Sequence, residues 1–121
     1  MSKVERFEDL NCWKEARQMV KMIFLTSRKE ELRKDFDLVG QLKSASLSVM
    51  NNIAEGFGRF SVKEFIRFLD IAQSSAQEVM SMTYVLIDLE YVTDQEFNEL
   101  QSKIGHTRNL ILGLIKYLKN K

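Results

Sequence analysis

The sequence contains no proline, and glycine occurs only five times in 121 residues. Both residues destabilise the interior of a helix, so their scarcity favours long helices. The net charge is also small, at +1 from 18 basic and 17 acidic side chains. This balance argues against a dedicated, strongly basic nucleic-acid binder, although a local basic face is compatible with it.

Cysteine and histidine each occur once, which restricts the chemistry that the chain can perform. Cys12 has no partner for an intramolecular disulfide, as is typical of a reducing compartment. A carboxylate-bridged metal site in a helical bundle needs paired glutamate–histidine motifs, and no glutamate lies three residues before His106. We therefore expect no metal, no cofactor and no catalytic site. Nucleophilic catalysis would require the fold to bring Cys12 and His106 together.

Long hydrophobic runs are absent too. A membrane-spanning helix needs about 18 uninterrupted apolar residues, and the apolar run at 19–25 is broken by Lys21. Residues 1–9 are charged and lack the apolar core of a signal peptide. The sequence thus predicts a cytoplasmic protein without a membrane partner.

The remaining sequence divides into four helical segments with short connections. We expect helices over about residues 10–28, 36–55, 61–89 and 93–120. Four long helices with short connections pack as antiparallel neighbours. The predicted fold is all-α: an antiparallel, up-down-up-down four-helix bundle that forms a single domain over residues 1–121.

Local signals mark the ends of these helices. Ser61 with Glu64, and Thr93 with Glu96, have the spacing of capping boxes. Gly56 and Gly58 follow the second segment, where a left-handed residue often ends a helix. The sequence therefore predicts a left-handed stop at this turn.

Apolar residues recur at helical intervals and predict one buried stripe on each helix. The predicted stripes on the first, second and fourth helices are Leu10, Trp13, Val20 and Phe24; Val39, Leu42, Val49 and Ile53; and Leu100, Ile104, Ile111, Leu114 and Leu118.

Two helices have wider apolar faces than a bundle requires. At about 100° per residue, apolar residues of the first and third helices cover arcs of roughly 200°. They are Ala16, Met19, Met22, Ile23, Trp13, Val20 and Phe24, and Phe65, Ile66, Phe68, Leu69, Ile71, Ala72, Val79, Met82 and Leu86. Our hypothesis is self-association through these two helices. The alternative is a monomer with a few exposed methionines.

A polar face follows the second helix toward its turn. Ser48, Asn52, Glu55 and Arg59 are spaced by four, three and four residues, and Ser75 and Glu78 are placed to face them from the third helix. These residues suit either a polar binding or acid–base site, or a hydrogen-bonded seam that fixes the register of two helices. We favour the seam, because buried polar groups require partners.

Basic residues form two rows that the net charge conceals. Lys14, Arg17, Lys21 and Arg28 line one flank of the first helix, and Arg108, Lys116 and Lys119 share one side of the fourth. Such rows attract phosphates, with strong salt dependence. The alternative is a solvated surface, with the basic residues at the end of the fourth helix complementing its dipole.

The most distinctive stretch reads NIAEGFGR at 52–59 and continues with Ser61 and with KEF at 63–65. It resembles the signature of the four-helix-bundle family named for the 23S ribosomal RNA intervening-sequence protein. Phe7, Asp9, Leu10 and Trp13 are similar to the start of that family. The similarity covers nearly the whole chain.

This resemblance implies a bacterial protein that assembles as a homopentameric barrel. A related branch is the accessory protein of diversity-generating retroelements, which binds a reverse transcriptase and nucleic acid. The implied partners are further copies of the chain, RNA or DNA, and a reverse transcriptase or other nucleic-acid enzyme. We therefore expect a non-enzymatic oligomeric helical scaffold that binds nucleic acid or such an enzyme. The alternative is a protein–protein interaction module with no nucleic-acid role.

Overall fold

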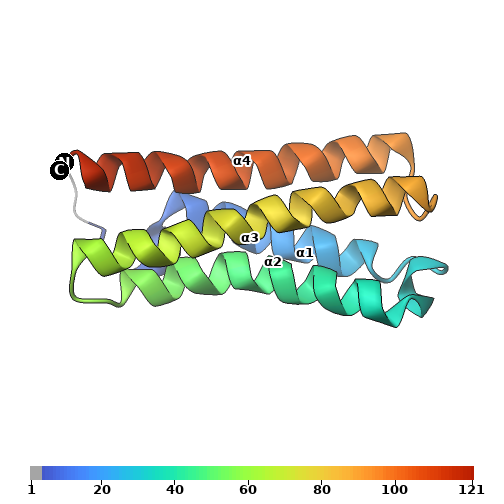
Figure 1. Ribbon diagram of the computed structural model, residues 1–121, viewed down its shortest axis with the longest axis horizontal. Helices are drawn as coiled ribbons and strands as arrows, with labels where there is room; N and C mark the ends of the chain where they lie inside the picture. The colour runs from blue at the N-terminus through green and yellow to red at the C-terminus, as the bar shows by residue number, and fades with distance from the viewer. Residues whose placement is uncertain (1–3) are drawn as a thin grey trace.

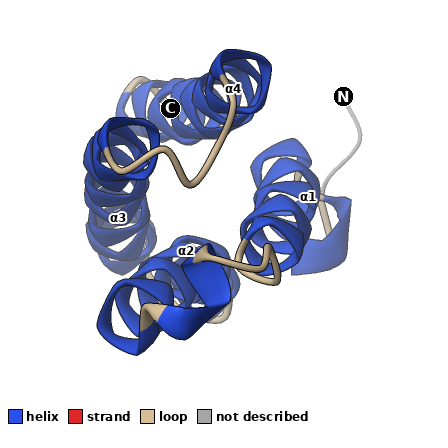
Figure 2. Cartoon of the chain, turned by 90° about the vertical axis from the view of Figure 1, so that its right-hand side faces the viewer, coloured by secondary structure: helices blue, strands red, loops and turns tan. Residues whose placement is uncertain are grey.

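A computed structural model of the chain describes residues 4–121. Its main elements are four helices, α1 (Asn11–Thr26), α2 (Phe36–Phe57), α3 (Val62–Asp88) and α4 (Asp94–Lys119). Two short 3₁₀ helices, η1 (Phe7–Asp9) and η2 (Leu32–Lys34), precede α1 and α2. Successive helices run in opposite directions, and α4 packs against both α3 and α1 (Figures 1 and 2). The prediction of an all-α four-helix bundle is confirmed.

Side-chain caps fix where α3 and α4 begin. Thr93 and Glu96 form the predicted capping box, with Glu96 N donating to Thr93 Oγ1 (3.1 Å) and Thr93 N to Glu96 Oε1 (2.8 Å). Ser61 Oγ likewise accepts from Glu64 N at 3.1 Å. The carboxylate of Glu64 instead binds the guanidinium of Arg67, so the structure has only half of the first predicted box.

The predicted left-handed stop after α2 is wrong. Gly58 has φ −78° and ψ −4°, a right-handed conformation, and no glycine among residues 4–121 has a positive φ. Gly56 lies within α2, and its role is steric. A Cβ there would lie 2.7 Å from Phe68 Cβ and 3.0 Å from Phe65 Cδ1, so the glycine permits close packing of α2 on α3.

The left-handed residue lies at the other end of α3, where Glu90 has φ 60°. Tyr91 N donates to Leu86 O at 2.9 Å across this turn, which satisfies a terminal carbonyl of α3. No residue type at this position predicted the left-handed conformation, because glycine or asparagine is the usual residue there.

The core contains most of the predicted stripes of α2 and α4. Leu42, Val49 and Ile53 of α2 are buried, as are four of the five predicted α4 residues: Leu100, Ile104, Ile111 and Leu118. Each fully buried aliphatic side chain of this kind contributes about 1.5–3 kcal/mol relative to exposure.

On α1, the buried face differs from the predicted stripe. The buried residues of this helix are Cys12, Ala16, Met19 and Ile23. Trp13, Val20 and Phe24 are only half-buried, with Lys43 of α2 lying over the Phe24 ring at 5.0 Å. Two apolar stripes lie side by side on α1, and helical spacing alone does not select which of them faces the centre.

The wide apolar arcs are largely covered inside the subunit. Met19 is fully buried and Met22 half-buried. Of the arc residues on α1 and α3 given above, only Ile71 is exposed, at 38%. The arcs therefore give less support to self-association than the sequence indicated, and the oligomeric state stays a prediction.

Candidate nucleic-acid interface

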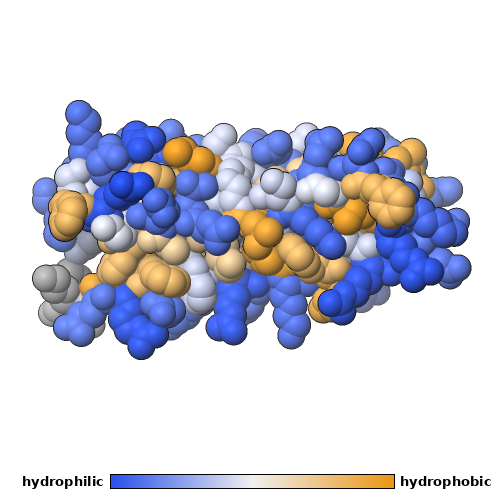
Figure 3. Space-filling view, turned by 90° about the horizontal axis from the view of Figure 1, so that it is seen from below, coloured by the Kyte–Doolittle hydropathy of each residue, from blue (hydrophilic) through white to orange (hydrophobic). Residues whose placement is uncertain are grey.

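The basic row on α1 lies on an exposed flank of the bundle. Lys14, Arg17 and Lys21 line a shallow groove, and Arg17 Cζ lies 5.8 Å from the centroid of the Trp13 ring. Within residues 4–121, no carboxylate forms an ion pair with any of these three cations. Figure 3 views the bundle from the side on which α2 lies, and it shows hydrophobic residues along the middle of that view and long hydrophilic side chains below them.

Arg28, the fourth predicted cation of this row, lies just beyond α1, which ends at Thr26. The Ser27 hydroxyl donates to Ile23 O at 2.7 Å, and Arg28 N donates to Leu25 O at 3.1 Å. Arg28 therefore belongs to the connection after α1 rather than to the helix itself.

The basic residues of α4 divide between two seams of the bundle. Arg108 Nε donates to Gln73 Oε1 of α3 at 3.1 Å, and Lys119 lines a groove with Lys63 and Arg67 of α3. Lys116 is exposed near the end of the same helix. In contrast, Lys103 faces α1, where it binds Glu15 at 3.0 Å. Because α1 and α3 lie diagonally opposite in the bundle (Figure 2), the α1 row and the α3–α4 cations face different directions.

The structure brings most of the predicted polar face together. Ser48 Oγ and Ser75 Oγ lie 2.9 Å apart, and Asn52 Nδ2 donates to Ser48 O at 2.8 Å and to Ser48 Oγ at 3.0 Å. This cluster joins α2 to α3. One turn along α2, Arg59 Nη2 donates to Glu55 Oε1 at 2.7 Å on the surface. Glu78 is exposed and joins neither set, so the structure places it outside the predicted face.

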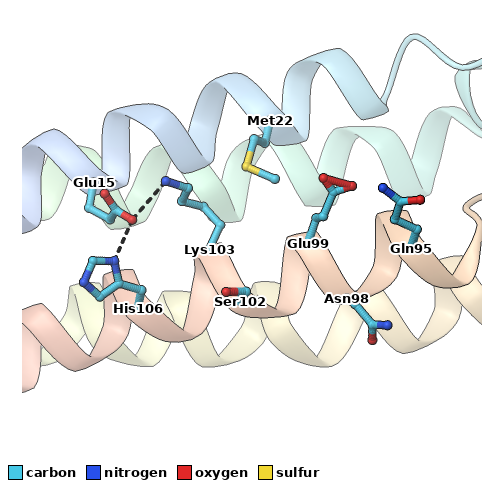
Figure 4. Close-up of a pocket in the computed structure, with 8 residues that line it drawn as sticks. All are labelled: Glu15, Met22, Gln95, Asn98, Glu99, Ser102, Lys103 and His106. Carbon is cyan, nitrogen blue, oxygen red and sulfur yellow. Dashed lines mark hydrogen bonds and ion pairs between the residues drawn. The ribbon is translucent and has the colours of Figure 1, made fainter.

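A second polar cluster, which the sequence analysis missed, joins α1 to α4 (Figure 4). Glu15 Oε2 accepts a hydrogen bond from Lys103 Nζ at 3.0 Å and lies 2.7 Å from His106 Nδ1. Burial raises the pKa of Glu15, but the hydrogen bonds from Lys103 and His106 outweigh burial and hold this pKa below its ordinary value. No local signal in the sequence links Glu15 to Lys103 and His106, which lie 88 and 91 positions further along the chain. Only the register of α1 against α4 brings them together.

Cys12 does not have the properties of a catalytic nucleophile. Burial raises the pKa of its thiol to about 11, so the thiol is protonated at neutral pH. The partner of His106 is Glu15. Within residues 4–121, no group of three or more histidine, cysteine, aspartate or glutamate side chains is placed to hold a metal ion. In the same part of the chain, no helix has the length and apolar character that crossing a membrane requires.

These observations define a small four-helix-bundle protein with basic groups on two separate surfaces. The chain belongs to the family described as 23S rRNA-intervening sequence protein, which its residues 8–113 match. This confirms the resemblance seen in the sequence. A comparison with curated proteins gave no match.

Solved structures share this fold, and one of them comes from a bacterium. It is the crystal structure of a protein of unknown function from the S23 ribosomal protein family of Bacteroides thetaiotaomicron. The two chains are 24% identical and superpose with a TM-score of 0.79, over 87% of this chain and 95% of the other. At this level of identity the likeness shows the fold alone.

Proposed function

We propose that this protein is a non-enzymatic helical scaffold that binds the phosphate backbone of structured RNA or DNA. The observation that carries this function is the α1 row, in which Lys14, Arg17 and Lys21 share one exposed flank without carboxylate partners among the described residues. Lys14 and Lys21 are separated by about 10 Å along the helix, or about three nucleotide rises of a single strand.

The contrast with other surface cations supports this choice. Arg59, Arg67 and Lys103 each bind a carboxylate, so their charge is largely neutralised inside the molecule. The cations of the α1 row are available to an external anion. Phosphate contacts of this kind release counterions, and the affinity then falls steeply as salt rises.

The experiment is a salt series of binding affinities for a structured RNA and a duplex DNA. We compare the wild type with the double variant K14Q/K21Q and with the matched control R33Q/K34Q, which removes two charges elsewhere. If both lysines contact phosphate, the slope of log affinity against log salt becomes shallower by up to about 2 in K14Q/K21Q alone. Equal slopes in all three proteins, or no binding at low salt, would contradict the proposal.

A second candidate function is a protein–protein interaction module, which includes docking of a reverse transcriptase or other nucleic-acid enzyme. The observation that favours it is exposed apolar surface on the outer side of α3, where Ile71 and Val85 are 38% and 41% exposed. This function predicts no salt-dependent binding to bare RNA or DNA.

A further inference from the structure

The tip of the α2–α3 turn presents a fully exposed aromatic ring. Phe60 lies between the end of α2 and the start of α3, and its relative exposure is 109%. Single exposed apolar residues are common on proteins, so exposure alone indicates no function. The surroundings of the ring therefore decide what it can do.

The residues on both sides of Phe60 are well packed. Phe57 and Phe65, on either side of the turn, meet edge to face with ring centroids 5.9 Å apart. Ser61 caps α3, and Gly56 packs closely against Phe68. The segment that carries Phe60 is thus fixed at both ends, while its ring points away from the core.

Four basic side chains lie beside the α2–α3 turn. The guanidinium groups of Arg59 and Arg67 both lie over the Phe68 ring, at 4.7 and 4.6 Å from its centroid. Lys63 and Lys119 line the adjoining groove between α3 and α4, and neither lysine forms an ion pair within the described part of the chain. The turn therefore combines one exposed aromatic face with two lysines, Lys63 and Lys119, that form no ion pair among the described residues.

We propose that this tip binds an unpaired nucleobase, with Phe60 stacking on the base and Lys63 and Lys119 contacting the flanking phosphates. Aromatic side chains beside basic grooves bind single-stranded nucleic acid in this way, because every base has a face that can stack. The unpaired loops and bulges of RNA expose such bases. This inference rests on the proposed function and specifies the ligand class of a second site.

The charges favour this ligand over an anionic membrane. The carboxylates of Glu55, Glu64 and Asp70 lie on the same helix ends as the cations. A flat anionic bilayer would meet all of these acids together with the lysines, whereas a single strand in the groove passes only Glu64, which already binds Arg67, and Asp70, which already accepts from Gln73.

The test compares an RNA hairpin with an unpaired loop against a fully paired duplex of the same stem. The loop carries 2-aminopurine, a base whose fluorescence falls when it stacks. F60A should weaken hairpin binding about 5- to 150-fold and abolish the fluorescence change. Duplex affinity and the salt slope should not change, because the substitution removes no charge.

F36A is the matched control. Phe36 is also highly exposed, at 81%, but lies at the other end of α2, so its loss should leave hairpin binding unchanged. K63Q/K119Q should weaken hairpin binding and reduce its salt slope. Because both rings are exposed, neither aromatic substitution should alter thermal stability.

The outcomes separate this inference from the proposed function. If no nucleic acid binds in a salt-dependent manner, the proposed function fails and this inference fails with it. If the wild type binds but F60A and F36A give equal hairpin affinities, only the site at Phe60 is overturned. Loss of binding by F60A to phosphatidylserine-containing vesicles, with hairpin affinity unchanged, would overturn it in favour of a membrane contact.

Discussion

Gly56 controls how closely α2 and α3 approach each other near their shared turn. Its neighbours across the interface are the Cβ of Phe68 and the ring of Phe65, both on α3. The Phe68 Cβ cannot yield easily, because it is bonded directly to the backbone of α3. The backbone oxygen of Phe65 would also lie only 3.3 Å from an added Cβ. At the residue scale, sterics rather than backbone conformation explain this glycine.

G56A should therefore destabilise the fold by about 1–3 kcal/mol, the usual cost of overpacking a core. The matched control is G40A in the same helix, where an added Cβ has no neighbour within 4 Å. That substitution should stabilise the protein by about 1 kcal/mol, because alanine is the better helix former. Urea unfolding of both variants measures the two effects, and equal effects of the same sign would refute the steric explanation.

The Glu15, Lys103 and His106 cluster is the clearest feature at the scale of elements. It ties the first half of α1 to the middle of α4 through one carboxylate with two basic partners. Glu15 is well shielded, with its side chain 15% exposed, so this contact is less screened than the surface pairs.

E15Q should lower the free energy of unfolding by about 1 kcal/mol near pH 7, because both partners lose their anion. The folded-state pKa of Glu15 is lowered from its ordinary value of 4.5. The contribution of the carboxylate is therefore complete above this value and is lost as the pH falls through the folded-state pKa.

The measurement is urea unfolding of wild type and E15Q from pH 7 down to pH 3. The difference between the two proteins should shrink toward the acid end. E99Q provides the control, since Glu99 lines the same groove but forms no ion pair within the described residues. A difference that does not depend on pH would show that the carboxylate charge is not the cause.

The distribution of charge matters most at the scale of the whole molecule. The α1 row and the α3–α4 cations face different directions, so one straight nucleic-acid helix does not meet both sets on a single subunit. In a closed ring of subunits each set would repeat around the axis, and a modest monomer charge could then form a continuous band.

Self-association is therefore a prediction in its own right. The outer face of α3 carries Ile71 and Val85, which lie about four helical turns apart and are both exposed. Light scattering at micromolar concentration should give a mass that is a multiple of 14.2 kDa, and five-fold if the family resemblance extends to assembly. I71D/V85D should reduce the mass to that of one chain without loss of helical circular dichroism. A wild type of monomeric mass would sink the prediction.

The sequence by itself determined the local features of this protein. Helical periodicity, the Thr93 cap and the run at 52–59 each depend on residues close together in the chain, and they predicted the bundle and the family. These signals persist whatever the helices pack against, because capping and amphipathicity act within one or two turns.

Only the tertiary structure decided how the helices are rotated and aligned against one another. It buried Cys12 and Met19 instead of Trp13 and Phe24, and it brought Glu15 to His106. It also separated two basic rows that look alike in sequence. The physical reason is that packing selects one face from a wide apolar arc, and contacts between distant residues exist only once that selection is made.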